Sequence, residues 1–182
     1  QLVSPTSFEG LAASVSLLES RLAPLLVTVD LAPYTGVNGE RVERRAAAAL
    51  RLRGDIAAGL TASRDVGVTQ ERLDVTVLAR DPVSGLTVFQ VPAGTDPTLA
   101  LWVPRRPQAA RYLIAVDVAR ARPTMRPVFV GSLTAATSPA WPGALWALPA
   151  RTDVAAGTLL FTFDGELAGL VVDHDDERAI VP

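Results

Sequence analysis

The spacing of hydrophobic positions changes after the first two dozen residues. Between Phe8 and Leu22 apolar residues recur every three or four positions, which is typical of an amphipathic helix. Ser7 is placed to cap the start of this helix, and Pro24 to end it. Beyond Pro24, short apolar runs rich in β-branched residues alternate with turn residues, a pattern that predicts strands. The sequence therefore predicts one short helix followed by an all-β fold.

Many short strands separated by Gly and Pro are typical of a barrel or a sandwich. The expected strands span residues 25–31, 49–53, 74–79, 87–91, 112–118, 128–133, 144–148, 158–163 and 166–172. Asp164-Gly165 lies between the last two runs and predicts a tight hairpin with a type I′ turn, in which both central residues have positive φ. Val91–Pro97 is the candidate linker, and it divides the strands into two comparable sets.

The composition then removes several kinds of chemistry. All 17 basic residues are Arg, Cys is absent, and His174 is the single histidine. Without Cys there is no thiolate nucleophile, thiolate zinc site or disulfide, and without Lys there is no Schiff base or Ser-Lys dyad. The net charge of −2 gives no reason to expect a nucleic-acid or polybasic membrane surface. No apolar run approaches the roughly 20 residues of a membrane span. We therefore expect no cofactor, no nucleic-acid partner and no membrane insertion by this segment.

Three segments, in order, resemble trypsin-like serine proteases of the HtrA/Deg type. Residues 59–66 (GLTASRDV) resemble the strand and turn that deliver the catalytic His, and residues 80–88 (RDPVSGLTV) resemble the stretch that supplies the triad Asp. Residues 152–170 resemble the nucleophile loop and the hairpin after it. The resemblance covers nearly the whole chain and implies a trypsin-like double β-barrel of two six-stranded barrels. The parts of this domain would be an N-terminal helical segment 1–24, a first barrel 25–92, a linker 93–97 and a second barrel 98–182.

The resemblance places unsuitable residues at all three triad positions. Arg64 stands where the family has its general-base His, Gly85 where it has Asp, and Ala156 where it has the nucleophilic Ser. A guanidinium stays protonated, Gly has no carboxylate and Ala has no hydroxyl, so no proton relay or nucleophile is left. The oxyanion hole would be formed by the N–H groups of Val154 and Ala156. A β-branched Val in place of Gly predicts that this loop is collapsed or turned over.

The resemblance also implies a surface that needs no catalytic side chain. In such proteases the strand after the nucleophile hairpin, here Val172, Asp173 and His174, pairs with an extended substrate through backbone groups. We therefore expect not an enzyme but a pseudoprotease that serves as a scaffold, a regulatory partner or a peptide-binding module. The family further implies an extracytoplasmic location, assembly into homotrimers, and PDZ domains or an anchor outside this chain.

Two other interpretations remain open. A hydrolase with a relocated carboxylate site would use Asp153, Asp173 or Asp175, whereas a carbohydrate- or small-ligand-binding β-module would centre on Trp141. The acidic run around His174 is expected to be a solvated loop with no metal bound. Consecutive residues at a strand end point to opposite faces, so they cannot all reach one ion.

Overall fold

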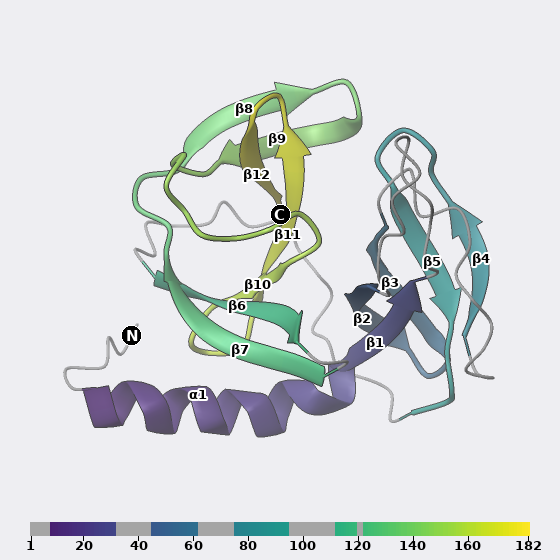
Figure 1. Ribbon diagram of the computed structural model, residues 1–182, viewed down its shortest axis with the longest axis horizontal. Coiled ribbons are helices and arrows are strands. Elements are labelled where there is room, and N and C mark those ends of the chain that lie inside the picture. Colours follow the sequence, from purple (N-terminus) through teal and green to yellow (C-terminus); the bar gives the residue numbers. More distant parts are fainter. Residues whose placement is uncertain (1–7, 32–44, 62–74, 95–111, 120–121) are drawn as a thin grey trace. The chain divides into compact units, whose positions relative to one another are not determined.

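The computed structural model describes residues 8–31, 45–61, 75–94, 112–119 and 122–182 of the 182-residue chain. The chain divides into two compact units, whose elements are labelled in Figure 1. The C-terminal unit consists of Gln1–Ala23, Leu99–Asp117 and Thr124–Pro182, and the N-terminal unit of Pro24–Thr98 and Val118–Pro123. The N-terminal helix is thus grouped with the second half of the chain.

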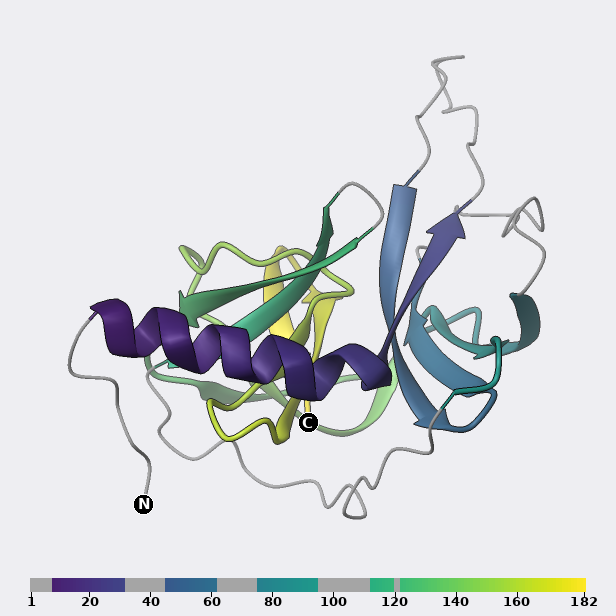
Figure 2. The same cartoon turned by 90° about the horizontal axis from the view of Figure 1, so that it is seen from below.

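The N-terminal unit holds a five-stranded antiparallel sheet in the order β1-β2-β3-β5-β4. Its strands are β1 (Leu26–Leu31), β2 (Arg45–Arg53), β3 (Ile56–Leu60), β4 (Thr76–Arg80) and β5 (Leu86–Gln90). Figure 2 shows β1 and β2 side by side, in the register Val29↔Ala47. Because successive strand residues point to opposite faces, every second side chain of β5 is buried. The core residues are Val29, Ala49, Ala57, Phe89 and Val91.

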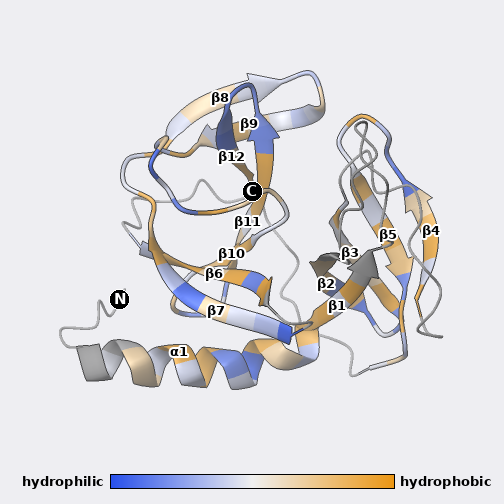
Figure 3. Cartoon of the chain, viewed as in Figure 1, coloured by the Kyte–Doolittle hydropathy of each residue, from blue (hydrophilic) through white to orange (hydrophobic). Residues whose placement is uncertain are grey.

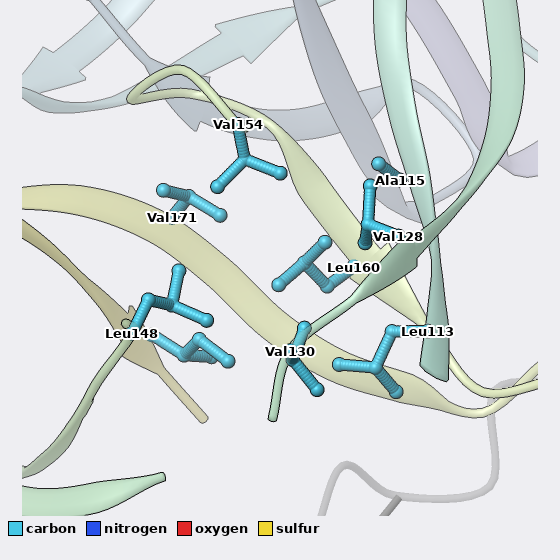
Figure 4. Packing of buried hydrophobic residues seen from close by; sticks show 9 residues of the cluster. Leu113, Ala115, Val128, Val130, Leu148, Val154, Leu160 and Val171 are labelled. Atoms are coloured by element: carbon cyan, nitrogen blue, oxygen red, sulfur yellow. The ribbon is translucent and has the colours of Figure 1, made fainter. Parts of the chain in front are cut away.

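The C-terminal unit holds a seven-stranded sheet in the order β7-β6-β10-β11-β12-β9-β8. Its strands are β6 (Tyr112–Ala119), β7 (Arg122–Phe129), β8 (Thr134–Ser138), β9 (Trp141–Ala147), β10 (Leu159–Phe161), β11 (Leu167–His174) and β12 (Glu177–Val181). Nine buried side chains form its core, and Figure 4 shows them converging from several strands. They are Leu113, Ala115, Val128, Val130, Leu148, Val154, Leu160, Val171 and Ile180.

Helix α1 (Phe8–Leu22) packs on the C-terminal unit, and its bounds agree with the predicted helix. Leu18 and Leu22, one turn apart, are 1% and 2% exposed. The Leu18 side chain lies only 3.2 Å from where a Cβ of Gly165 would be, so the helix sits directly against the turn between β10 and β11. None of the described helices is long and apolar enough to cross a membrane.

The expectation of an all-β chain with one N-terminal helix is confirmed, although several strands were not expected. The strands β8 and β12 were not predicted, and β3 was expected only from the resemblance. The strand expected at 128–133 overlaps only the last two residues of β7, which begins at Arg122, ends at Phe129 and contains Pro123 and Pro127. Since β7 is an edge of its sheet, proline is tolerated there. The described residues form sheets of five and seven strands, where the resemblance implied six in each unit.

The predicted type I′ turn at Asp164-Gly165 is wrong, because only Gly165 has a positive φ, of 81°. Thr162 N–H donates to the carbonyl of Glu166 at 2.8 Å, and Gly165 N–H donates to the carbonyl of Thr162 at 3.0 Å. This is a three-residue loop with a left-handed Gly that forms a bulge. The Thr162 hydroxyl favours it by accepting from Glu166 N–H at 3.1 Å.

Candidate functional site

The sequence-predicted site residues fall in both units. Gly85 lies in the N-terminal unit, at the end of the turn between β4 and β5. Val154 and Ala156 lie in the loop before β10, and the segment 172–174 ends β11, all in the C-terminal unit. Arg64 lies outside the described residues. Within the C-terminal unit, the structure brings the nucleophile-position loop against β11.

In the N-terminal unit, Asp81 organises the turn that carries Gly85. Its carboxylate accepts from Val83 N–H at 3.3 Å, from Ser84 N–H at 3.0 Å and from the Ser84 hydroxyl. Gly85 N–H donates to the Asp81 carbonyl at 2.9 Å, and Asp81 N–H to the Leu86 carbonyl at 2.9 Å. The hydrogen bonds from Ser84, above all that of its hydroxyl, and then from Val83 N–H, lower the pKa of Asp81 because they favour the charged form.

Gly85 itself occupies a backbone position that excludes a side chain. Its φ is +75°, and a Cβ there would lie 2.6 Å from the carbonyl oxygen of Thr61. Thr61 N–H donates to the Gly85 carbonyl at 3.0 Å, which fixes the approach of the two strands. The buried Thr87 hydroxyl also donates to this carbonyl, at 3.1 Å. The position that the resemblance assigns to the triad acid therefore has a backbone that favours glycine.

In the C-terminal unit, Ala156 sits in a tight turn held by backbone bonds. Thr158 N–H donates to the Ala155 carbonyl at 3.2 Å, and Gly157 has φ +92°, as the third residue of a type II turn requires. Gly157 N–H donates to the Val171 carbonyl at 2.8 Å, and Val171 N–H to the Thr158 carbonyl at 2.9 Å. These two bonds form a bulge against β11 that fixes the turn.

Val154 points into the core of the C-terminal unit. Its side chain is 8% exposed and lies beside Val171 (Figure 4). Its N–H donates to the Thr152 carbonyl at 2.9 Å, so this donor is used inside the loop. Ala156 N–H has no acceptor among the residues that the structure describes. Of the two N–H groups that resemblance assigns to an oxyanion hole, only that of Ala156 is therefore left to bind an oxygen.

A network of polar side chains, which the sequence did not predict, holds both ends of this loop by hydrogen bonds. The Thr158 hydroxyl donates to Asp117 Oδ1 at 2.5 Å, and Arg126 Nε donates to Asp117 Oδ2 at 3.0 Å. Arg126 Nη2 donates to the Asp153 carbonyl at 2.5 Å, while Nη1 lies 3.5 Å from Asp153 Oδ2. One signal was present in the sequence, because Asp117 is a single charged residue within an apolar run.

The expected peptide-binding edge is largely paired within the sheet. Val172, Asp173 and His174 lie opposite Ala179, Arg178 and Glu177 of β12. On the other side of β11, the register with β10 ends at Leu159↔Leu170, and Val171 bonds to the bulge described above. Backbone groups two residues apart point to the same side, so Asp173 N–H and C=O face the β10 side. No described strand lies opposite Asp173 there.

The carboxylates of the alternative hydrolase site lie at the surface. The side chains of Asp153 and Asp175 are 97% and 91% exposed, and Asp173 Oδ1 lies 2.5 Å from Arg178 Nη1. Within the described segments, no three His, Asp or Glu side chains are arranged to hold a metal ion. Trp141 is half-buried at the start of β9, opposite Ser138.

Several solved structures share the fold of this chain. The crystal structure of Deg5 superimposes with a TM-score of 0.65 at 11% identity, covering 97% of this chain and 91% of that chain. The active form of the Rv3671c protease from M. tuberculosis gives 0.62 at 16% identity, covering 100% and 83%. A serine-to-alanine mutant of Rv3671c from M. tuberculosis H37Rv, in its inactive form, gives 0.60 at 14% identity, covering 100% and 90%. No family model and no curated protein sequence matches this chain.

These similarities establish the fold. The chain has the trypsin-like fold of HtrA-type serine proteases, as its three sequence segments predicted. At identities of 11% to 16%, the comparisons concern architecture and not chemistry.

Proposed function

We propose that this chain is a non-catalytic domain of the trypsin-like fold that binds an extended peptide or protein segment. The observation that carries the proposal is the loop before β10. By resemblance this loop has Ala156 where the family has its nucleophile, and the Val154 N–H is used in a bond to the Thr152 carbonyl. Gly85 supports the same conclusion, because its backbone leaves no room for a carboxylate-bearing side chain.

Magnitudes argue against useful proteolysis. A trypsin-like site without its triad retains a rate enhancement of roughly 10³ to 10⁴ over the reaction in water, from the oxyanion hole and substrate binding. Loss of one oxyanion donor removes a further factor of about 10² to 10³. Enzymes typically accelerate their reactions by at least about 10⁶-fold, so the rate of proteolysis at this loop would be negligible.

Peptide binding requires only backbone groups that face an unoccupied side of a strand. Asp173 offers an N–H and a C=O on the side where β10 has ended, next to the bulge at Gly157. An extended segment would add there as a short strand in β-augmentation. A protein partner, an extracytoplasmic location and trimer formation stay predictions of the resemblance. No specific observation favours the relocated hydrolase site or a ligand site at Trp141.

Two assays on the whole chain test this proposal together. We expect no cleavage of unfolded casein, and we expect retention of extended peptides from a random library. Asp173→Pro removes the N–H that faces the free side while leaving the β12 ladder intact, so it should abolish retention. Val172→Pro would instead remove an N–H that strand alternation directs towards β12, so it would disturb the sheet and not the free side.

Circular dichroism checks that Asp173→Pro folds, and peptides N-methylated at alternate residues test the same hydrogen bonds without changing the protein. Library retention that ignores both changes would contradict peptide binding at β11. Casein cleavage that is lost on mutating Asp153 or Asp175 would instead support the hydrolase.

A further inference from the structure

The turn that joins β11 to β12 concentrates the negative charge of the chain. Residues 173–177 contain four carboxylates, and the adjacent Arg178 is the single guanidinium of the hairpin end. Four negative charges against one positive charge give a formal charge of −3. Because the whole chain carries −2, all its other residues together carry +1. Figure 3 colours the end of this hairpin as hydrophilic.

Three of these carboxylates have no guanidinium partner among the residues that the structure describes. Asp175, Asp176 and Glu177 are exposed, and none is paired with a guanidinium in the part of the chain that the structure describes. Asp175 Oδ2 lies 3.8 Å from His174 Nε2, a ring that is charged only when protonated. The Arg178 guanidinium is already engaged by Asp173. The described charges at this end of β11 are therefore mainly negative.

The same strand end is where the sheet can accept another strand. Asp173 presents its N–H and C=O on the side that β10 leaves open, and the acidic turn begins two residues later. A strand advances about 3.3 Å per residue, so side chains of an added segment pass within a few residues of the turn. Backbone recognition and uncompensated charge thus occur at one place.

We propose that the segment bound at the Asp173 edge is a cationic extended peptide, with Arg or Lys at alternate positions. This inference rests on the proposed function and names the chemical class of the partner. Carboxylates that are not paired within the protein attract a cationic chain and repel an acidic one, which raises the association rate and sets selectivity. The backbone groups of Asp173 then supply the sequence-independent part of the affinity.

Fluorescence anisotropy with designed octapeptides tests the proposal. One peptide alternates Arg and Val, a second alternates Glu and Val, and two N-methylated copies of the first block either its odd or its even N–H groups. We expect the Arg peptide to bind at least tenfold more tightly than the Glu peptide. One of the two methylated copies should lose binding, because only one set of N–H groups faces β11.

The variant Asp175→Asn/Asp176→Asn/Glu177→Gln should weaken binding of the Arg peptide about tenfold, at about twofold per exposed charge. Asn retains the tolerance for the left-handed backbone that Asp175 adopts with φ +52°. The matched control is Glu19→Gln/Asp55→Asn/Asp164→Asn, which removes the same charge elsewhere and should leave binding unchanged within about twofold. Raising the salt from about 50 to 500 mM should also weaken binding.

The possible results separate the two proposals. Equal binding of the Arg and Glu peptides, with sensitivity to N-methylation, would overturn the cationic selectivity and leave peptide binding standing. Binding of the Arg peptide that ignores both N-methylation and Asp173→Pro would be diffuse charge attraction and would overturn both. Absence of binding by either peptide would also overturn both.

Discussion

At the scale of single residues, two glycines differ sharply in what a side chain would meet. Gly85 has φ +75°, and its Cβ position is 2.6 Å from a carbonyl oxygen, whereas a Cβ on Gly143 would meet nothing within 4 Å. Gly85→Ala should lower the free energy of unfolding by about 2 kcal/mol or more, because it adds left-handed strain to a clash. Gly143→Ala, the matched control, should stay within about 0.5 kcal/mol of wild type. Urea denaturation measures both, and equal stability of the two variants would refute the special backbone of Gly85.

Asp81 should make the stability of the N-terminal unit depend on pH. Its hydrogen bonds lower the folded-state pKa below the ordinary value of 3.8. The carboxylate therefore contributes stability above about pH 3.8, and this contribution is lost as the pH falls through the lowered folded-state pKa. Asp81→Asn should be less stable than wild type at pH 6, and the difference should shrink at about pH 2. Urea titrations of both proteins at the two pH values check this, and a difference that does not change with pH would contradict it.

Which site residues could be predicted from the sequence depends on how locally each is determined. Gly85 and Ala156 could be assigned to triad positions by resemblance, because each lies inside a contiguous motif. Asp117 and Thr158 were not, because their hydrogen bond joins positions 41 apart in the sequence. The hydrogen bond from Arg126 to Asp153 joins residues 27 positions apart, so local sequence patterns cannot predict it either.

At the scale of elements, the loop before β10 depends on neighbouring strands for its shape. Arg126→Ala removes both contacts to Asp153 and one contact to Asp117. Charge-assisted hydrogen bonds contribute about 1.5 to 3 kcal/mol when buried and less at half-exposed sites such as this one. We expect the loop amides of Val154 and Thr158 to exchange hydrogen at least about fivefold faster in the variant.

Arg151→Ala is the matched control for this exchange experiment, because Arg151 is an exposed Arg next to the same loop. Its loop amides should exchange as in wild type. Unchanged exchange in Arg126→Ala would mean that the backbone turn alone holds the loop.

Helices and strands were predicted where apolar residues recur at regular spacing. They were missed where the segment is short of large apolar residues or begins in a charged run. The helix Phe8–Leu22 was predicted at its observed bounds, because its apolar periodicity is strong. The strand β8 (Thr134–Ser138) contains no large apolar residue, and β12 begins within an acidic run, so neither shows strand alternation. The hairpin at Gly165 was predicted, but its turn type was wrong because the Thr162 hydroxyl stabilises a longer loop.

At the scale of the whole molecule, the fold follows from the sequence, and the proposed lack of proteolysis rests on the backbone as well as on the three side chains. Restoring the three side chains with Arg64→His/Gly85→Asp/Ala156→Ser should therefore not restore proteolysis. The strained position 85 would accept Asp poorly, and the Val154 N–H would stay bonded to Thr152. Casein cleavage by this triple variant is the measurement, with a folding check by circular dichroism. Cleavage well above that of wild type would show that the backbone is still competent.

The central claim is that the natural chain has no activated serine. Incubation with an excess of a serine-directed phosphonate, followed by intact-protein mass spectrometry, tests it most directly. We predict that the mass stays that of the unmodified chain, because the resemblance assigns Ala156 to the nucleophile position. Stoichiometric addition of one phosphonate at any serine would contradict the account.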